Sequence, residues 1–298
     1  MDDFKPITLN DKEIFDDFLA QDPPHVSELT FTNLFMWRIC NDTLWKTEYD
    51  CILVVLRPQD VQPYGLPPMG PGDKVSAMRK LAEYLSEISS EPRIARVDKN
   101  AVDRYISPDE YAIIEDRDNF DYVYLAEDLI NLSGKRFHGK KNHLNKFLKN
   151  YEFEYRGLDE DLVKSFMELQ EDWCEIRDCE ASEDLSNENV AVYEALKNYG
   201  RLDFRGGAIL IDSKVEAFSL GERLNHDTAV IHIEKANPEI PGLYVAINNH
   251  FCASEWSHLK YVNREQDLGV PGLRKAQEAY HPDHMVEKFV LVPKRPRP

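Results

Sequence analysis

The sequence predicts an α/β fold of the mixed α+β kind, divided into two similar-sized halves, each with a mixed, mostly antiparallel sheet flanked by helices. The chain has 298 residues, of which 42% are hydrophobic, and this is enough apolar material for two ordinary cores. Segments with apolar residues at helical spacing alternate with apolar runs of strand length. Residues 204–234 predict three consecutive antiparallel strands joined by turn-type residues.

The first half is expected to span residues 1–130. Its clearest helix covers residues 75–88, where apolar side chains recur with a period of three to four residues. A Pro- and Gly-rich stretch at 62–72 cannot be regular structure throughout. The other expected elements are helices at 10–20 and 27–38, and strands at 44–49, 51–56, 92–97, 111–115 and 122–125.

The second half is expected to span residues 151–298 and has the clearer order of elements, which the first half repeats more loosely. No repeat is visible in the sequence itself. The Pro-rich end, residues 293–298, is expected to be frayed. The expected elements are a strand at 151–155, helices near 162–173 and 190–196, strands at 204–211, 215–224 and 228–234, a helix at 241–255, a strand at 261–262, a helix at 271–280 and a strand at 288–292.

Residues 131–150 predict a basic helix that connects the two halves. Between residues 133 and 150 there is no Asp or Glu, although the net charge of the chain is −18. One interpretation is a site for the phosphates of RNA or of lipid headgroups, at a cleft between the halves. The other is a solvated connector whose lysines pair with surface acids, and the sequence leaves both open. The candidate binding residues are Lys135, Arg136, Lys140, Lys141, Lys146 and Lys149. The face predicted to dock on a core carries Phe137, Leu144, Phe147 and Leu148.

A second candidate site lies at a predicted strand-to-helix turn. Gly269 and Gly272 would let the backbone approach a ligand closely, and a helix that begins near residue 271 offers free N–H groups. Asp267 and Arg274 flank these glycines. An ordinary ion pair is one interpretation of the two charges, and a place for a substrate group is the other.

Several classes of protein lose support. The sequence has no GxSxG, HExxH, GxxxxGK[ST] or GxGxxG pattern, which disfavours serine hydrolases, zinc proteases, P-loop enzymes and dinucleotide-binding proteins. The number of cysteines is five and no CxxC occurs, so we expect reduced thiols rather than a disulfide or a zinc site. No metal is expected.

The expected location is the cytoplasm. No apolar run approaches the roughly 18 residues that span a bilayer, and the first residues do not resemble a signal peptide. The acidic net charge disfavours indiscriminate binding to nucleic acids or anionic membranes. Peripheral contact with a membrane stays open.

Three segments together resemble a bacterial family similar to the C-terminal domain of phosphatidylglycerol lysyltransferases. The first is Phe31-Thr32-Asn33-Leu34-Phe35-Met36-Trp37-Arg38. The second runs from Asp121 through Ser133-Gly134-Lys135 to Phe147. The third, residues 266–282, contains Asp267, Gly269, Arg274 and Tyr280, and through it the resemblance adds Tyr280 to the candidate binding residues.

The resemblance implies two tandem domains of the acyl-CoA N-acyltransferase (GNAT) fold, with a more remote similarity to Fem-type transferases. Those relatives use aminoacyl-tRNA as donor, so the resemblance implies tRNA as a partner and no other cofactor. The lysyltransferases also carry a membrane-embedded portion ahead of this domain, which we do not expect here. The identity of the acceptor therefore does not transfer with the resemblance.

Coenzyme A is the less favoured donor. Acetyl-CoA-dependent members of the fold place a basic, Gly-rich pyrophosphate loop after the fourth strand. Residues 234–243 occupy that position here and contain one Gly, two Pro and two Glu. Carboxylates beside a pyrophosphate repel it, so we expect that coenzyme A does not bind there in the usual way.

The leading functional hypothesis is an aminoacyl transferase that moves an amino acid from a charged tRNA to an amine or hydroxyl of a lipid headgroup, a peptide or a small molecule. Its ester donor is already activated, so alignment, oxyanion stabilisation and proton acceptance would suffice. In this hypothesis Asp267 orients the incoming amine and Arg274 holds a phosphate or carboxylate. The alternatives are an acyl-CoA N-acyltransferase and a non-catalytic module that binds a small anion.

Overall fold

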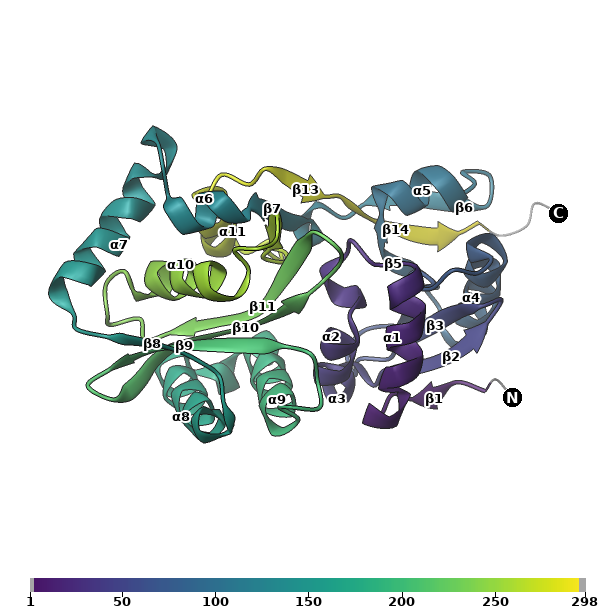
Figure 1. Cartoon of the computed structure of the whole chain (residues 1–298). Helices are drawn as coiled ribbons and strands as arrows, with labels where there is room; N and C mark the ends of the chain where they lie inside the picture. The colour runs from purple at the N-terminus through teal and green to yellow at the C-terminus, as the bar shows by residue number, and fades with distance from the viewer. Residues whose placement is uncertain (1–2, 295–298) are drawn as a thin grey trace. The chain divides into compact units, whose positions relative to one another are not determined.

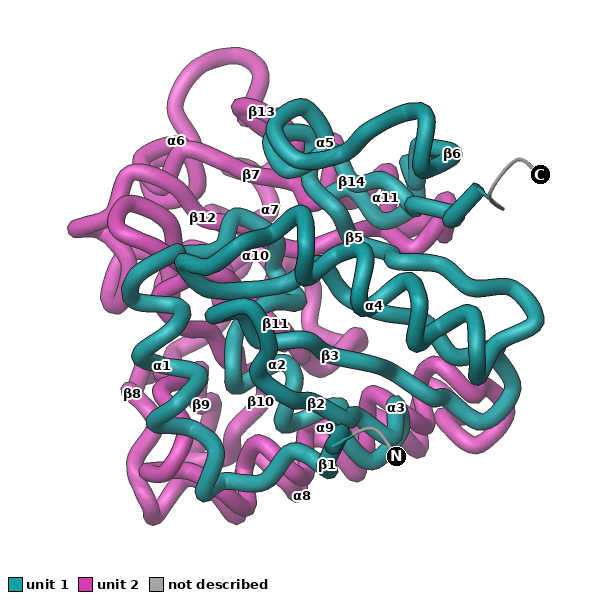
Figure 2. The backbone as a smooth tube through the Cα atoms, turned by 90° about the vertical axis from the view of Figure 1, so that its right-hand side faces the viewer, with its two compact units in different colours: residues 1–120, 286–298 teal, residues 121–285 magenta. Residues whose placement is uncertain are grey.

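The structure, a computed structural model, describes residues 3–294 and divides into two compact units (Figures 1 and 2). Unit 1 consists of the residues up to Phe120 together with those from Val286 onward, and unit 2 is Asp121–Met285. These divisions differ from the expected 1–130, 131–150 and 151–298. The reason is strand pairing across long sequence distances. Residues 288–293 pair with strands of unit 1, and residues 123–125 pair with residues 261–263 in unit 2. The expected frayed residues 295–298 lie outside the described range.

Unit 1 is built on a mixed sheet with the strand order β1-β2-β3-β4-β5-β14-β6. Most neighbours are antiparallel, and β4 and β5 are parallel. The last strand of the chain, β14, inserts between β5 and β6 and pairs with both. The strands are β1 (Lys5–Pro6), β2 (Leu44–Glu48), β3 (Cys51–Leu56), β4 (Tyr64–Gly65), β5 (Ile94–Asp98), β6 (Tyr111–Glu115) and β14 (Lys288–Pro293).

Helices cover both faces of β3, whose residues are all buried. Val55 packs with Leu81 of α4 on one face. Trp45, which pairs with Val54 and therefore shares the other face, stacks edge-on against Phe15 of α1. The helices of unit 1 are α1 (Lys12–Gln21), α2 (Phe31–Met36), α3 (Arg38–Asn41), α4 (Lys74–Ile88) and α5 (Lys99–Tyr105).

The helix expected at 27–38 is broken at Thr30. This residue is extended, and its hydroxyl accepts a hydrogen bond from the backbone N–H of Asn33 at 3.1 Å. A threonine that caps in this way starts a new helix rather than continuing one. A 3-10 turn at Ser27–Leu29 therefore precedes α2.

Unit 2 is built on a second mixed sheet with the order β13-β7-β12-β11-β10-β9-β8. The predicted run of three antiparallel strands is confirmed as β9, β10 and β11. β11 and β12 are parallel, and β12 pairs with β7 in the antiparallel sense. The strands are β7 (Asp121–Leu125), β8 (Glu154–Gly157), β9 (Arg205–Ile211), β10 (Lys214–Arg223), β11 (Thr228–Ala236), β12 (Tyr261–Asn263) and β13 (His284–Val286).

The helices of unit 2 lie on both faces of its sheet. In Figure 1, α8 and α9 lie on one face of β9–β11 and α10 lies on the other, with α6 and α7 packed against α10. The α10 face is filled by a core that includes Phe251 and Trp256. The helices are α6 (Ala126–Asn131), α7 (His138–Asn150), α8 (Glu160–Arg177), α9 (Glu183–Lys197), α10 (Leu243–Glu255) and α11 (Pro271–Glu278).

Several elements and one cysteine pair differ from the sequence-based expectation. The short elements β1, β4, α5, α6 and β13 were not predicted. The strand expected at 151–155 begins only at Glu154, where pairing with β9 starts. Cys174 and Cys179 form a disulfide, whereas reduced thiols were expected, because the left-handed residue Asp178 ends α8 and turns the chain back on itself. Within the described range, no helix has the length and apolarity needed to cross a bilayer.

Candidate functional site

The candidate site lies in unit 2, where the pairing of the two parallel strands β11 and β12 ends. Their register runs from Thr228 and Tyr261 to Val230 and Asn263, while β11 continues to Ala236. Polar side chains gather beyond this point. We name them the junction cluster: Lys140 from α7, Glu234 from β11, Asn248 from α10, Arg264 from the turn after β12, and Tyr280 from the turn after α11.

Glu234 and Arg264 form the ion pair at the centre of the junction cluster. The Nη2 of Arg264 donates to Oε1 of Glu234 at 3.1 Å, and the Nδ2 of Asn248 donates to Oε2 at 2.9 Å. Both carboxylate oxygens of Glu234 are thus occupied. The second terminal guanidinium nitrogen, Nη1 of Arg264, is buried and has no hydrogen-bond partner among the described residues. One hydrogen-bond donor of Arg264 therefore remains unused inside the junction cluster.

Two cations contact the ring of Tyr280. The Nζ of Lys140 lies 3.8 Å from the ring centre, and the Cζ of Arg264 lies 4.6 Å from it. The negative face of an aromatic ring attracts cations, and this attraction holds the lysine near the arginine despite their like charge. Burial lowers the pKa of Lys140, the charge of Arg264 lowers it further, and Glu234 opposes both, which leaves it at about 8.

The floor of the junction cluster is held by hydrogen bonds from three elements. The hydroxyl of Tyr124, on β7, donates toward the backbone oxygen and Oε1 of Gln277, each at 2.9 Å. The Nε2 of Gln277 in turn donates to the backbone oxygen of Arg264 at 2.9 Å. The backbone at Arg264 is thus tied to α11 and, through Gln277, to β7.

The structure brings the predicted residues Asp267 and Arg274 together, but they bind each other rather than facing an open site. The Nε and Nη2 of Arg274 donate to the two carboxylate oxygens of Asp267, each at 2.8 Å. Tyr122 and the N–H of Gly269 donate to the same carboxylate at 2.5 and 2.8 Å. The side chain of Asp267 is 0% exposed, so a contact with an incoming amine would require this pair to open. Gly272 is exposed at the start of α11.

The pKa of Asp267 reflects these bonds. Burial alone would raise the pKa of this carboxyl, but the hydrogen bonds from Arg274, Tyr122 and Gly269 outweigh burial and lower the pKa to about 2. The residue is therefore ionised at neutral pH. Its geometry fits a structural part, which is to hold the turn between β12 and α11.

The six basic candidates on and before α7 do not share one environment. Lys140 joins the junction cluster, whereas Arg136 forms an ion pair with Asp128 at 2.7 Å. The other lysines, Lys135, Lys141, Lys146 and Lys149, are exposed. Their expected place at a cleft between the halves stays a prediction.

The predicted apolar face of the basic helix is confirmed with one exception. Phe137 and Phe147 are fully buried and Leu144 is partly buried, but Leu148 is 44% exposed. Residues 147 and 148 are separated by about 100° around a helix, so α7 presents a narrower face to the core than the sequence suggested. This face fixes which way the lysines of α7 point.

A hollow of about 250 Å³ lies on the opposite face of the sheet, between α8 and the connection from β11 to α10. Its lining includes four carboxylates, those of Asp172, Glu175, Glu216 and Glu239, and a single lysine. Such a surface repels phosphates and carboxylates. We therefore place the candidate site at the junction cluster.

Sequence reasoning missed three members of the junction cluster. Asn248 and Arg264 were not among the candidate residues, and Glu234 entered only as a residue of the loop after β11. One signal was available. Glu234 is an acidic residue in an apolar strand, and a charge at such a position needs a buried partner.

Two mixed-sheet units in tandem define the chain as a tandem acyltransferase-fold protein. A tandem GNAT protein from the clavulanic acid biosynthesis pathway has the same fold, with a TM-score of 0.52, 12% identity and 99% coverage of both chains. The chain belongs to the family described as phosphatidylglycerol lysyltransferase, C-terminal, whose model matches residues 20–292. The resemblance inferred from the sequence is thereby confirmed.

Two further solved structures are similar over nearly the whole chain. A conserved protein of unknown function from Bacteroides thetaiotaomicron VPI-5482 is 34% identical with a TM-score of 0.91, covering 99% of this chain and 100% of the other. L-PGS from Bacillus licheniformis is 12% identical with a TM-score of 0.65, covering 96% and 92%. An uncharacterized protein of Mycoplasmoides gallisepticum is 25% identical over 178 residues, and the chain covers 55% of that curated relative, about half its length.

Proposed function

We propose that the chain is an aminoacyl transferase and that its reaction takes place at the junction cluster. Membership of the lysyltransferase family supports the class of reaction. The observation that carries the location is Lys140, which projects from the basic helix α7 onto Tyr280 and lies close to Arg264. Perturbed titratable groups of this kind concentrate at functional sites.

The proposed donor is a charged tRNA. The exposed lysines of α7, Lys141, Lys146 and Lys149, would neutralise backbone phosphates of the RNA. Lys140 lies on the same helix but faces the junction cluster. In this proposal the acceptor arm of the tRNA lies along α7, with its aminoacylated 3′ end close to Lys140.

The proposed chemistry needs one proton acceptor and no covalent enzyme intermediate. The nitrogen or oxygen of the acceptor attacks the carbonyl carbon of the aminoacyl ester and forms a bond to it. The neutral amine of Lys140 takes the proton that the acceptor loses. The bond between the carbonyl carbon and the ribose oxygen then breaks, and the proton passes from Lys140 to that oxygen. A base with a pKa near 8 suits this exchange at physiological pH.

Arg264 has two proposed parts in this reaction. Together with burial, which has the larger effect, its positive charge lowers the pKa of Lys140 to about 8, so that part of the lysine is neutral at physiological pH. The same charge would stabilise the negative charge that develops on the ester carbonyl oxygen in the transition state. Glu234 and Asn248 would hold the arginine in place for both parts.

Coenzyme A is not the donor that we propose, and the start of α10 supports this choice. Gly242, the residue before α10, has a φ of +89°. A Cβ atom at this position would lie 2.5 Å from the backbone oxygen of His143 and 3.1 Å from the Cβ of Phe147. Helix α7 is thus packed directly against the helix end where the pyrophosphate of coenzyme A is held in the acetyl-CoA-dependent members of the fold.

The proposed acceptor is defined by chemistry only: a lipid headgroup, peptide or small molecule with a free amine or hydroxyl. Incubation with a mixed pool of radiolabelled aminoacyl-tRNAs and a cell extract of lipids and small molecules tests the proposal. We expect saturable loss of label from tRNA and its appearance in an acceptor. Absence of acceleration with every amino acid would overturn the proposal, and tight calorimetric binding of acetyl-CoA would favour an acyl-CoA transferase instead.

A matched set of variants ties the activity to Lys140. We expect Lys140→Met to lower kcat, because the proton acceptor is lost. Lys141→Met, next to it on the exposed side of α7, should raise KM and leave kcat in place, since it removes one phosphate contact. Lys164→Met, an exposed lysine of α8, should change neither constant.

A further inference from the structure

A bulge in β11 re-aims the side chain of His232. Leu220 of β10 pairs with Ile233 and Gly221 pairs with Ile231, so His232 is an extra residue in its strand. A Cβ on Gly221 would meet Phe251 of α10, so Gly221 faces α10 and its neighbour Glu222 faces away. The Nε2 of His232 lies 2.8 Å from Oε1 of Glu222, which places His232 on the face away from α10.

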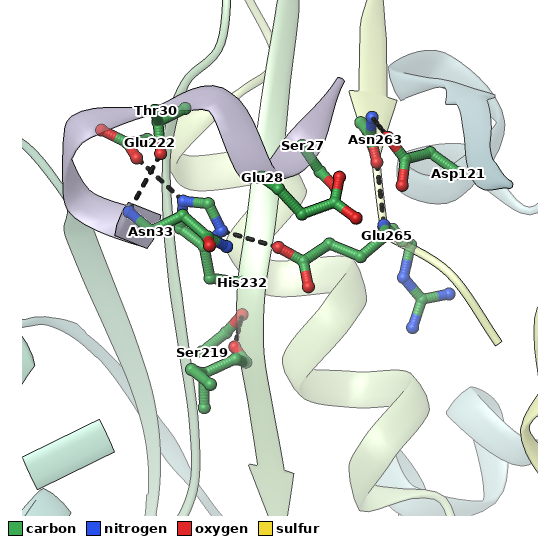
Figure 3. A network of polar contacts seen from close by, with 12 residues as sticks. Ser27, Glu28, Thr30, Asn33, Asp121, Ser219, Glu222, His232, Asn263 and Glu265 are labelled. Carbon is green, nitrogen blue, oxygen red and sulfur yellow. Dashed lines mark hydrogen bonds and ion pairs between the residues drawn. The ribbon is translucent and has the colours of Figure 1, made fainter. Parts of the chain in front are cut away.

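The other ring nitrogen of His232 contacts the turn that carries Arg264. Its Nδ1 lies 2.7 Å from Oε1 of Glu265, the residue that follows Arg264 (Figure 3). On the α10 face, Glu234 holds Arg264 itself. Two residues of β11 therefore hold two consecutive residues beyond β12. On the α10 face the acidic Glu234 holds the basic Arg264, and on the other face the basic His232 holds the acidic Glu265. These two ion pairs begin where the backbone register of β11 and β12 ends.

The geometry around His232 fits protons on both ring nitrogens. Ionised carboxylates only accept hydrogen bonds, and each nitrogen faces one carboxylate oxygen. The side chain of His232 is 2% exposed, so water cannot replace either contact. Burial alone would lower the pKa of this histidine, but the hydrogen bonds to Glu222 and Glu265 outweigh it and raise the pKa to about 10.

Glu265 adopts a backbone conformation that needs external support. Its φ is +57°, in the left-handed region that non-glycine residues seldom occupy. The side-chain oxygen of Asn263 accepts from the N–H of Glu265 at 2.8 Å, and the N–H of Tyr122 donates to its carbonyl at 3.0 Å. The contact with His232 ties the side chain of Glu265 to β11.

We propose that His232 is a positioning residue for the junction cluster: by holding Glu265, it places Arg264 against Glu234 and Tyr280, beside Lys140. His232 does not touch a substrate, since it is buried on the other face of the sheet. The effect of this placement on turnover rests on the proposed function. The placement of Arg264 is measurable without any activity, because the ionisation of Lys140 reports on it.

The test measures the titration of Lys140 by trace acetylation at a series of pH values, followed by mass spectrometry, with exposed Lys141 as internal reference. The charged groups that face Lys140 are Arg264, which lowers its pKa, and Glu234, which raises it. In Glu265→Ala the turn loses its tie to His232 and Arg264 moves away from Lys140. We expect the titration midpoint of Lys140 to rise by roughly one pH unit.

Glu222→Ala is the matched control, because it removes the other carboxylate from the same histidine but leaves the turn attached. The midpoint of Lys140 should stay within about 0.3 of the wild-type value in this variant. Glu265→Gln should also keep it, since the amide oxygen still accepts from Nδ1. If Glu265→Ala acted only by removing a negative charge near Lys140, the midpoint of Lys140 would fall rather than rise. If Glu265→Ala does not fold, the Lys140 midpoints of Glu265→Asp and Glu222→Asp are compared instead. Each of these variants shortens one of the two carboxylate side chains that contact His232.

An equal shift of the Lys140 midpoint in the Glu265 and Glu222 variants, or no shift in either, would overturn the proposal. The rate of aminoacyl transfer provides the second measurement. We expect Glu265→Ala to lower kcat by about tenfold and to move the pH–rate profile upward together with the Lys140 midpoint, while Glu222→Ala changes neither. A wild-type protein without transfer activity would count against the proposed function alone, because the titration still decides the positioning.

Discussion

The Nζ of Lys140 lies 3.8 Å from the centre of the Tyr280 ring, and these two residues are 140 positions apart in the sequence. The contact directs one lysine of a basic helix away from solvent while its neighbour Lys141 stays exposed. It also buries Lys140 and brings it near Arg264, and burial and the charge of Arg264 together lower the pKa of the lysine. A charge pattern that looks uniform in the sequence is thus divided by the fold into a surface part and a part in the junction cluster.

Asp267→Asn should destabilise the protein at neutral pH by about 2 kcal/mol and less in acid. The folded pKa of about 2 lies below the ordinary aspartate pKa of 3.8, so ionised Asp267 contributes stability above about pH 4 that is lost as the pH falls toward 2. Urea unfolding at pH 7 and at pH 3 measures the difference. Asp60→Asn, in an exposed turn, is the control and should show no such pH dependence. A constant loss at both pH values would contradict the assignment of Asp267 as a buried, ionised partner of Arg274.

Gly242→Ala should lower the stability of the fold by about 3 kcal/mol. The new Cβ would meet the backbone oxygen of His143 at 2.5 Å, and the residue would also carry a positive φ. Gly272→Ala is the matched control: it has open space around it and lies in helix α11, so it should stabilise by less than about 1 kcal/mol. Equal effects of the two substitutions on the urea midpoint would show that α7 does not pack against the start of α10.

The disulfide between Cys174 and Cys179 predicts a specific thiol count. Protein that is denatured without reductant should show three reactive thiols, those of Cys40, Cys51 and Cys252. After reduction all five cysteines should react. Five thiols in both conditions would restore the expectation drawn from the sequence, that of reduced cysteines.

The exposed lysines of α7 predict the salt dependence of tRNA binding. Replacing Lys141, Lys146 or Lys149 by Ala should lower the slope of log affinity against log salt by about one each, with little effect on stability. Lys164→Ala on α8 should leave the slope as it is. Slopes that do not change in any of the α7 variants would return this helix to the role of a solvated connector.

Much of the fold could be predicted from local sequence patterns. The strands β9, β10 and β11 were predictable because Asp212-Ser213-Lys214 and Asn225-His226-Asp227 are turn residues between apolar runs. Pairings over long sequence distances were not predictable. Leu291 of β14 pairs with Ile94 of β5, and Val123 of β7 pairs with Asn263 of β12. Periodicity in a single strand does not say which partner it takes, and this is why the expected boundaries of the two halves differ from units 1 and 2.

The candidate site was predictable only in part, for the same reason. The absence of acids near Lys140 marked its segment, and the turn with Asp267 and Arg274 was visible as a pair of charges that flank two glycines. The partner of Arg264 was not visible, because Glu234 lies 30 residues away on another strand. Nor could the sequence show that Lys140 is partly buried while Lys141 is exposed, because this difference depends on the contact of Lys140 with the distant ring of Tyr280.

The pH dependence of aminoacyl transfer tests the central claim most directly. If Lys140 accepts the proton of the acceptor, the wild-type kcat should rise with pH through a midpoint near 8 and level off above it, because only the neutral amine is active. Lys140→Met should abolish this rise, while Lys141→Met should keep it at the same midpoint. A wild-type profile without a midpoint near 8, or an unchanged profile in Lys140→Met, would contradict the account.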